Sequence, residues 1–455
     1  MSSFAPDLFH SDNVGLEPHP TARDKAVAKN VLRTGSLILS IPSLATILLP
    51  TEKGQRCDCC FSSQSSGVTL RRCTGCASYW YCGTKCQTLQ WPIHKRFCKN
   101  FNRYFASTAF DSLEAHEKLD ALLLTHLSAE ASIEDITPHR AREISIFLSL
   151  VPGPAVNTRI PPICPLSTKE RPTNLDALYA RCGNNNFTIH SHLTTIAHGV
   201  FPLASRLFNH SCLPNAAAKV IIEPSQAISL NIIALRDIAV GEEICIPYLD
   251  PALLQTRQQI FQLTYGFTCS CPSCIMMENI GRLPPLPESE NELGALNTAL
   301  RHFVFPSWEH DASEILLPAK PFTEIPRSLF PVLHESYLTQ LSESFSSTSH
   351  DGPSDTALDV GLTLLALYAL IYPPNYPQIG MHSLEMAKTA WNASIIAERN
   401  ESRFGTAAVD LEKKAQLYLR LSSEILNVFG PEGDPGGPLE EISVLQSLIH
   451  ENMRV

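Results

Sequence analysis

Alternating apolar and polar residues predict strands in three parts of the chain. Residues 35–49, GSLILSIPSLATILL, predict two strands that meet at Pro42. Residues 219–235, KVIIEPSQAISLNIIAL, contain two apolar runs about a turn and predict a hairpin. In EEICIPY, residues 242–248, Ile244, Ile246 and Tyr248 share one face of a strand and Cys245 faces the other way, which favours a core position for Cys245. These segments indicate a β-rich core.

Helical periodicity dominates the remaining segments. Residues 111–127 and 138–151 carry apolar residues at helical spacing, within a region 101–185 that is expected to be helical. Asp250 and Pro251 suit an N-cap and first helical residue, so a helix is predicted over 251–267. After the proline-rich RLPPLPESENE, five or six helical segments are predicted, separated at SSTSHDGPSD and GPEGDPGGP, without a clean 34-residue repeat.

Composition indicates a globular protein without a membrane span. The 455 residues are 44% hydrophobic and 18% charged, and allow two or three domains. The net charge of −10 argues against a surface built as a whole for nucleic acid. MSSFAPDLFHSDN has neither a basic start nor an apolar core, so no signal peptide is expected. The apolar run 360–372 is too short for a bilayer and predicts a buried helix.

Fifteen cysteines are clustered, which in a chain without a secretory signal favours metal sites over disulfides. The first cluster, residues 57–98, offers four pairs of ligands at spacings of two or three residues: Cys57 with Cys60, Cys73 with Cys76, Cys82 with Cys86, and His94 with Cys98. Eight ligands make two tetrahedral zinc sites, and metal binding would supply much of the folding energy of so small a segment. Cys59 is an alternative to its neighbours, but the regular spacing favours leaving it spare.

A second cluster is one ligand short of a zinc site. YGFTCSCPSC supplies Cys269, Cys271 and Cys274, and spacing alone does not choose the fourth ligand. Upstream, SRLFNHSCLPN holds His210 and Cys212, a pair that could also suggest a nucleophile with its base. No other local feature supports a nucleophilic enzyme, because such chemistry also needs an oxyanion site.

The motifs together resemble a known family. NHSCLPN (209–215), GEEICIPYLD (241–250) and YGFTCSCPSC (265–274) resemble a SET domain with its post-SET tail, and residues 57–98 resemble a MYND zinc finger. Over about residues 20–275 the chain is similar to the SET and MYND domain family of protein lysine methyltransferases. The resemblance implies that ligand pairs alternate between metals, giving three zinc sites: Cys57, Cys60, Cys82 and Cys86; Cys73, Cys76, His94 and Cys98; and Cys212, Cys269, Cys271 and Cys274.

The resemblance also implies a cofactor, S-adenosylmethionine, and roles for the residues around it. Tyr248 matches the catalytic tyrosine, and Tyr265 and Phe267 match the aromatic pair that lines the lysine channel, with Phe267 also packing on the cofactor. Residues expected to contact the cofactor are Asn209, His210, Asn185, Ser205 and Phe208. The register at Asn185 is ambiguous because three asparagines follow one another.

Two departures from the family pattern bear on activity. Arg23, Asp24 and Lys25 stand where the family usually has a glycine-rich turn, and their side chains are expected to crowd the cofactor. Pro247 precedes Tyr248 and cannot donate a ladder hydrogen bond, so it is expected at an edge or in an unpaired position. Either departure would weaken activity.

The implied fold is α+β: a β-rich SET domain interrupted by a zinc-bound MYND finger and a helical insertion, then an all-helical, tetratricopeptide-like C-terminal domain. The expected boundaries are 1–50 for the first SET part, 53–99 for the finger, 100–185 for the insertion, 186–250 for the catalytic core, 251–278 for the post-SET segment, and 285–455 for the helical domain.

Two functions fit this organisation. The first is a lysine methyltransferase acting on a protein substrate, a histone among the candidates. The second is an inactive zinc-dependent adaptor or transcriptional co-regulator that works through the finger. Expected finger partners are a proline-containing peptide or transcription regulators, with a weak nucleic-acid contact through its eight Lys and Arg against one acid between Lys53 and Lys99. We expect a monomer in nucleus and cytoplasm, without membrane association.

Overall fold

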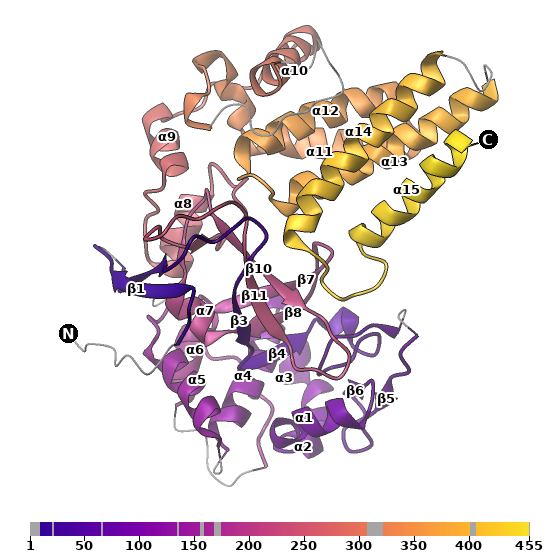
Figure 1. Ribbon diagram of the computed structural model, residues 1–455. Helices are drawn as coiled ribbons and strands as arrows, with labels where there is room; N and C mark the ends of the chain where they lie inside the picture. Colours follow the sequence, from indigo (N-terminus) through magenta and orange to yellow (C-terminus); the bar gives the residue numbers. More distant parts are fainter. Residues whose placement is uncertain are drawn as a thin grey trace.

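The computed structural model describes residues 10–20, 22–64, 67–133, 136–154, 159–167, 174–306, 322–400 and 406–454. Small sheets form a central β-rich core, the helices after residue 285 lie above it, and the cysteine-rich finger with its following helices lies below (Figure 1). The mixed α+β organisation predicted from the sequence is therefore confirmed.

The core consists of short strands in several sheets. One sheet has the order β10 (Ala216–Ile221), β11 (Ser229–Ala234), β3 (Leu37–Pro42); a second has the order β4 (Ala45–Leu48), β8 (Thr194–Val200), β7 (Asn186–Ser191). The remaining pairs are antiparallel β1 (Val14–Pro18) with β2 (Asp24–Ala28) and parallel β9 (Asn209–His210) with β12 (Cys245–Ile246). The predicted strands around Pro42 and the predicted hairpin are both present.

Pro42 is the point at which the chain changes sheets. Its strand β3 pairs antiparallel with β11, whereas β4, three residues later, pairs with β8. Apolar residues on the inner faces of both strands, such as Ile41 and Leu48, are fully buried. Proline lacks the N–H that a continuous ladder would need, so a strand end at this residue is the expected outcome.

The finger and the helical insertion form the lower part of the molecule. The finger contains β5 (Arg71–Arg72), β6 (Trp80–Tyr81) and α1 (Thr84–His94), and α2 (Cys98–Phe105) begins at its last ligand. The insertion continues with α3 (Thr108–Asp111), α4 (Ala115–Ala131), α5 (Pro138–Ser149) and α6 (Leu175–Cys182). Side chains of Ser107 and Thr137 accept hydrogen bonds from Phe110 and Arg140 backbone N–H groups at the helix starts.

The C-terminal region is helical throughout the residues described. It follows α9 (Pro272–Ile280) and comprises α10 (Glu290–Val304), α11 (Glu335–Asp351), α12 (Ser354–Ile371), α13 (Pro377–Asn400), α14 (Thr406–Phe429) and α15 (Pro438–Arg454). Helix α12 is long and apolar enough to cross a membrane by composition, but 67% of it is buried among its neighbours. It is thus the buried helix expected at residues 360–372.

One predicted helix break is shorter than expected, and one predicted helix start is wrong. The break predicted at SSTSHDGPSD is present, but α11 continues to Asp351, so the break is only Gly352 and Pro353. The helix predicted from Pro251 begins instead at Arg257, with α8 (Arg257–Ile260) and the π-helix η4 (Phe261–Tyr265).

A tertiary contact explains the later start of α8. The Asp250 carboxylate accepts from the backbone N–H of Ala252 at 2.9 Å, which favours a turn. Glu335, at the start of α11, accepts from the backbone N–H groups of Gln255 and Thr256 at 2.7 and 2.8 Å. The backbone N–H groups before α8, which have no partner within the helix, are therefore bound by the Glu335 carboxylate of the helical region. The local sequence does not reveal this contact.

Candidate functional site

A pocket of about 710 Å³ opens between the β-rich core and the C-terminal helices. The core contributes residues from β2, β7 and β10 and from the segments around Asn209 and Tyr248, while Tyr376, Phe429 and Glu432 come from the helical region. This volume is in the range of small-molecule sites. Of the predicted site residues, Asn185, Ser205, Asn209, Tyr248, Tyr265 and Phe267 line the pocket.

Three aromatic rings meet on one wall of the pocket. The ring centroids of Tyr248 and Tyr265 are 5.2 Å apart, and Phe267 lies 6.3 Å from Tyr248 and 6.1 Å from Tyr265. Phe261, from η4, stacks on Phe267 at 5.1 Å. Phe261 was not among the predicted site residues, although its place four residues before Tyr265 puts both on one helical face.

Tyr248 is held at both its backbone and its hydroxyl. The hydroxyl donates to the backbone carbonyl of Phe208 at 2.7 Å, and the backbone N–H donates to His210 Nδ1 at 2.9 Å. Burial raises the pKa of Tyr248 well above its ordinary value. The hydroxyl therefore keeps its proton at neutral pH and can orient a neighbouring group but not act as an anionic base.

Asn209 joins three segments beside the pocket. Its side-chain amide donates to the backbone carbonyl of Asp24 at 2.9 Å and to Glu243 Oε1 at 2.8 Å. Its strand β9 runs parallel to β12, with Asn209 opposite Cys245. The amide thus fixes the start of β2 against the strand that leads to Tyr248.

His210 and Phe208 are not among the residues that line the pocket, and their expected contacts with a cofactor stay a prediction. The His210 ring faces Tyr248 N–H and Cys212 Sγ instead, at 2.9 and 3.2 Å. Phe208 is 1% exposed, and its carbonyl reaches the site only through Tyr248. The order of residues in NHSC does not indicate which side chains turn inward, because β9 is only two residues long.

The pocket does not single out one of the three successive asparagines. Asn184, Asn185 and Asn186 all line the pocket. The Asn185 amide donates to the carbonyl of Arg181 at 3.0 Å and to Asn184 Oδ1 at 2.8 Å, and Asn186 Oδ1 lies 3.0 Å from His198 Nδ1.

The expected crowding at Arg23, Asp24 and Lys25 is only partly present. Arg23 and Asp24 line the pocket, but Lys25 pairs with Glu17 on β1 at 3.1 Å and does not. Asp24 forms an ion pair with Arg206, which is only 8% exposed and also lines the pocket. Arg206 was not among the predicted site residues. The sequence signal that could have identified it was its position as a charged residue directly after the predicted site residue Ser205.

Pro247 lies just outside the paired strand, as expected. Strand β12 ends at Ile246, which is opposite His210, and the next ladder bond is the one from Ser211 N–H to the Ile246 carbonyl at 3.2 Å. The missing N–H of Pro247 therefore leaves no ladder partner unpaired.

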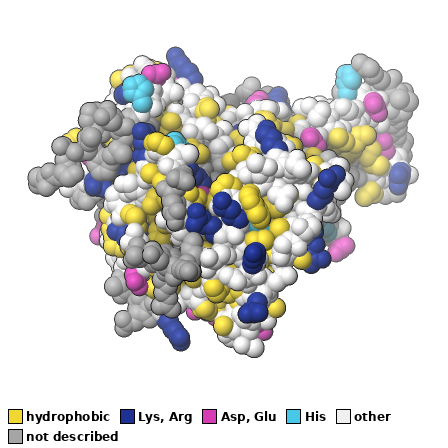
Figure 2. All heavy atoms as spheres, turned by 90° about the horizontal axis from the view of Figure 1, so that it is seen from below, with side chains coloured by type: hydrophobic (Ala, Val, Ile, Leu, Met, Phe, Trp, Pro, Cys, Tyr) yellow, Lys and Arg dark blue, Asp and Glu magenta, His cyan; other side chains and the backbone are white. Residues whose placement is uncertain are grey.

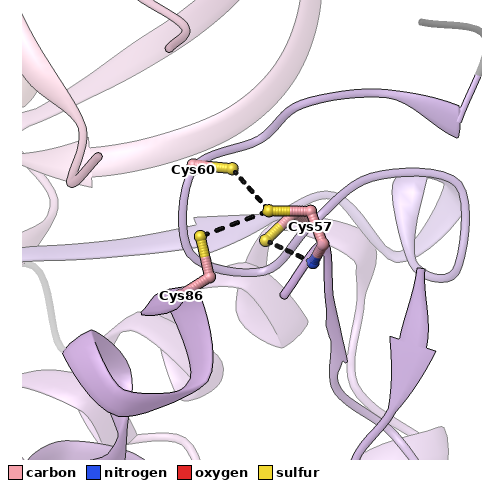
Figure 3. A group of neighbouring side chains, drawn as sticks. Cys57, Cys60 and Cys86 are labelled. Carbon is pink, nitrogen blue, oxygen red and sulfur yellow. Dashed lines mark hydrogen bonds between the residues drawn. The ribbon is translucent and has the colours of Figure 1, made fainter. Parts of the chain in front are cut away.

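Twelve predicted metal ligands come together as three tetrads, with the alternation that the family resemblance implied. Within each tetrad the donor atoms lie within 4.8 Å of one another: Cys57, Cys60, Cys82 and Cys86; Cys73, Cys76, His94 and Cys98; Cys212, Cys269, Cys271 and Cys274. Figure 3 shows Cys57, Cys60 and Cys86 of the first tetrad converging from a loop and from helix α1. Cys59 is outside every tetrad, as the spacing predicted.

The chemistry of these donors suits zinc. Burial lowers the pKa of His94 to about 4, so its imidazole is neutral and has a lone pair for a metal. The pKa of Cys271 is lowered to about 6 by hydrogen bonding, first of all to Cys212. Four sulfur or nitrogen donors at tetrahedral spacing are the usual structural zinc set.

Comparison with known proteins identifies the family. The SET domain family model matches residues 25–249, on both sides of the finger. Human histone-lysine N-methyltransferase SMYD3 is 24% identical over 380 residues, covering 78% of this chain and 83% of that protein. This chain is a SET domain protein related to the lysine methyltransferases SMYD2 and SMYD3.

Other SET relatives agree with this assignment. Zebrafish (Danio rerio) N-lysine methyltransferase SMYD2-A is 25% identical over 360 residues, covering 75% of this chain and 80% of that protein. Arabidopsis thaliana histone-lysine N-methyltransferase ASHR1 is 28% identical over 286 residues, covering 59% of this chain and 54% of that protein. A solved SET domain structure, LSMT bound to lysine and AdoHcy, covers 98% of this chain and 88% of its own at 13% identity, but its TM-score of 0.26 is too low to support any argument.

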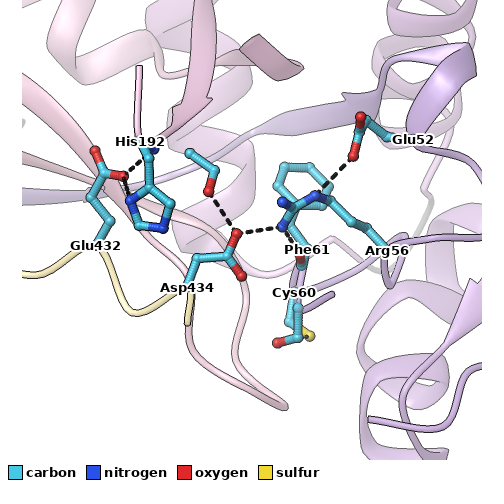
Figure 4. Close-up of polar contacts among 9 residues, drawn as sticks. Glu52, Arg56, Cys60, Phe61, His192, Glu432 and Asp434 are labelled. Carbon is cyan, nitrogen blue, oxygen red and sulfur yellow. Dashed lines mark hydrogen bonds and ion pairs between the residues drawn. The ribbon is translucent and has the colours of Figure 1, made fainter. Parts of the chain in front are cut away.

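A loop of the helical region also contacts the SET domain and the finger. In this loop, residues 430–438, Asp434 accepts from Arg56 of the finger at 2.7 Å and from Ser191 of the SET domain at 2.6 Å (Figure 4). Glu432 accepts from the backbone N–H of His192 at 2.6 Å and lines the pocket. The sequence GPEGDPGGP predicts only a separator between helices, because Gly and Pro indicate a turn without indicating which residues the turn contacts.

Lys and Arg side chains are spread over the lower face of the SET protein, with few acidic groups between them (Figure 2). Those exposed on the finger include Arg71, Arg72, Lys85, Lys95 and Lys99. The local basic excess seen in the sequence is therefore on the surface.

Proposed function

We propose that the protein binds S-adenosylmethionine and a substrate lysine in the aromatic-walled pocket and methylates the lysine amine there. The observation that carries this proposal is Tyr248: a protonated hydroxyl, fixed by Phe208, at the meeting point of two other aromatic rings. The cofactor would supply an activated methyl group; positioning is then a large part of what the protein contributes.

Each wall of the pocket has a role in this proposal. Tyr265 and Phe267 would surround the aliphatic stem of the lysine and exclude water, which disfavours its charged form. Tyr248 would orient the neutral amine through its hydroxyl. Asn209, Ser205 and Asn185 offer polar groups for the cofactor, and the volume of about 710 Å³ accommodates a nucleoside with an amino-acid tail.

The test is methyl transfer with a matched pair of variants. Labelled cofactor is incubated with the protein and either histones or a cell lysate, and methyl-lysine is identified by mass spectrometry. Tyr248→Phe should reduce kcat by roughly 100-fold or more, because it removes one positioned hydrogen-bonding group. Tyr265→Phe removes the same atom from the neighbouring ring and should have a much smaller effect. Equal activity of wild type and Tyr248→Phe would refute the proposed role.

A zinc ion in each tetrad is the second part of the proposal. Three buried sets of thiolate and imidazole donors support it. Elemental analysis of the purified protein should give three zinc ions per chain, and removal by a chelator should lower thermal stability because metal binding contributes folding free energy.

An adaptor function remains a second candidate because of one contact. The ion pair between Asp24 and Arg206 lies on the pocket wall, where the family usually has glycines. Calorimetry with S-adenosylmethionine separates the two functions: saturable binding in the micromolar range or tighter supports the enzyme, and absence of binding supports the adaptor. Under either function the basic finger would recruit a partner with a complementary acidic surface.

A further inference from the structure

The His210 side chain lies between the third tetrad and the catalytic strand. Its Nε2 is 3.2 Å from Cys212 Sγ, and its Nδ1 is 2.9 Å from the backbone nitrogen of Tyr248. The ring also packs at 4.4 Å from Phe261 and 5.3 Å from Tyr248, measured between ring centroids. One imidazole thus contacts a metal ligand, the backbone of Tyr248 and the aromatic wall.

The hydrogen bonds fix the tautomer of this ring. A backbone N–H can only donate, so Nδ1 must be the unprotonated acceptor. In a neutral imidazole the proton is then on Nε2, which faces the sulfur of Cys212. A metal-bound thiolate can accept a hydrogen bond from this N–H group. Metal ligands that are held by such an outer hydrogen bond bind their metal more firmly.

Pro247 explains why Tyr248 needs this acceptor. The parallel pairing of β9 with β12 ends at Ile246, and Pro247 donates no hydrogen bond. The chain that carries Tyr248 therefore leaves the sheet two residues before the tyrosine. The next backbone N–H is bound by a side chain, His210 Nδ1, in place of a ladder partner.

We propose that His210 is a positioning residue that couples the post-SET metal site to the orientation of Tyr248. This inference rests on the proposed methyltransferase function and deepens it. Metal binding at Cys212 orients the ring through Nε2, and the ring orients the backbone of Tyr248 through Nδ1. The same tetrad holds Cys269 and Cys271, a few residues after Tyr265 and Phe267, so one metal site places all three rings of the aromatic wall.

Two substitutions separate the two ends of the ring. In His210→Asn, the amide oxygen can replace Nδ1 as acceptor for Tyr248, but the side chain is too short to reach Cys212. In His210→Gln, the longer amide can donate to Cys212, but no acceptor remains at the Nδ1 position. Circular dichroism and thermal unfolding identify any variant that fails to fold.

Each variant is expected to affect mainly one of two quantities, kcat or the rate of metal release. His210→Gln should lower kcat by about 10- to 100-fold, more than it changes the KM of either substrate, and should release its metal at nearly the wild-type rate. His210→Asn should release one metal ion to a chelator about 10- to 100-fold faster, followed with a metallochromic dye, and lose less kcat than His210→Gln.

Three outcomes would overturn the inference: parallel losses of metal and kcat in both variants, no change in either, or the reverse pattern. A metal-release difference without any methyl transfer by the wild type would instead contradict the proposed function, while leaving the contact between His210 and the tetrad supported. The metal measurement therefore keeps the two failures distinguishable.

Discussion

At the scale of single residues, Cys212 and Cys245 lie on neighbouring segments but in different surroundings. Cys212 is 1% exposed and belongs to the third tetrad, whereas Cys245 lies opposite Asn209 in β12 and in none of the tetrads. Burial raises the pKa of Cys245 to about 12, so its thiol stays protonated and unreactive. The two cysteines form a matched pair for a substitution experiment.

We predict that Cys212→Ser reduces the metal content from three ions to two and abolishes methyl transfer, because Tyr265 and Phe267 lose their anchor to β9. Cys245→Ser should retain all three ions. Elemental analysis and a methyltransferase assay on the same preparations measure both effects. Full metal content in Cys212→Ser would contradict the assigned ligand set.

Residue types predicted the metal ligands well because zinc restricts both the donors and their spacing. The alternation of pairs and the choice of Cys212 came from the family resemblance, and the geometry agrees with both. The orientation of His210 was not predictable. A histidine has two nitrogens that either donate or accept, and their partners, Cys212 and Tyr248, are set by tertiary packing.

At the scale of elements, the loop 430–438 owes its path to glycines. Gly433 has φ +85°, and a Cβ there would be 2.3 Å from the carbonyl oxygen of Ile222. Gly436 has a similar φ of +71°, but a Cβ there would meet nothing within 4 Å. The two positions separate the cost of the backbone conformation from the cost of close approach.

We predict that Gly433→Ala destabilises the protein by roughly 1–3 kcal/mol more than Gly436→Ala, because only the first forces a backbone carbonyl to move. Both variants share the cost of a left-handed residue, about 1–2 kcal/mol. Urea unfolding monitored by circular dichroism gives the comparison. Equal destabilisation would mean that the loop shifts without cost.

Elements with strong periodicity were predicted, and their limits were not. Helix α4 and the hairpin β10–β11 follow from apolar spacing alone. Helix α8 starts late because Glu335 binds the N–H groups before it, whereas α11 continues through SSTSHD and ends only at Gly352 and Pro353. The start of α8 depends on a contact between residues about 80 positions apart, which a local pattern does not contain.

At the scale of the whole molecule, one carboxylate links the helical region to the SET domain in a pH-dependent way. His192 lies 3.2 Å from Glu432, and hydrogen bonding to Glu432, the largest cause, raises the pKa of His192 above its ordinary value of 6.5. The charge of Asp434 also raises the pKa of His192. Lys219 is a nearby cation whose pKa is lowered by burial, an effect that the charge of Glu432 opposes. A raised pKa stabilises the folded state below the unfolded pKa, and this stabilisation is lost as pH rises through the folded value.

We predict that Glu432→Gln lowers Tm more at about pH 6 than at about pH 8.5, since protonated His192 gains from the charge only at the lower pH. Glutamine can still accept from the His192 backbone N–H, so only the charge is removed. In a His192→Gln background the substitution should have the same effect at both values. Differential scanning calorimetry measures all four combinations, and a pH-independent loss in the wild-type background would contradict the coupling.

The order of segments was predictable for the whole chain, but their mutual contacts were not. The SET match on both sides of the finger agrees with the interrupted domain inferred from the motifs. The docking of residues 430–438 on Arg56 and Ser191 joins positions more than 240 residues apart in the chain, which no local pattern predicts.

Because of the same loop, mutations that truncate the last part of the chain are expected to have a strong effect. Every residue of the SET motifs is encoded before codon 275, so a nonsense mutation near codon 430 would leave all of them intact. The shortened product would nevertheless lack Glu432 and Asp434, and with them one wall of the pocket and the brace to the finger. A stop codon that spares every catalytic motif would therefore be expected to behave as a loss-of-function allele.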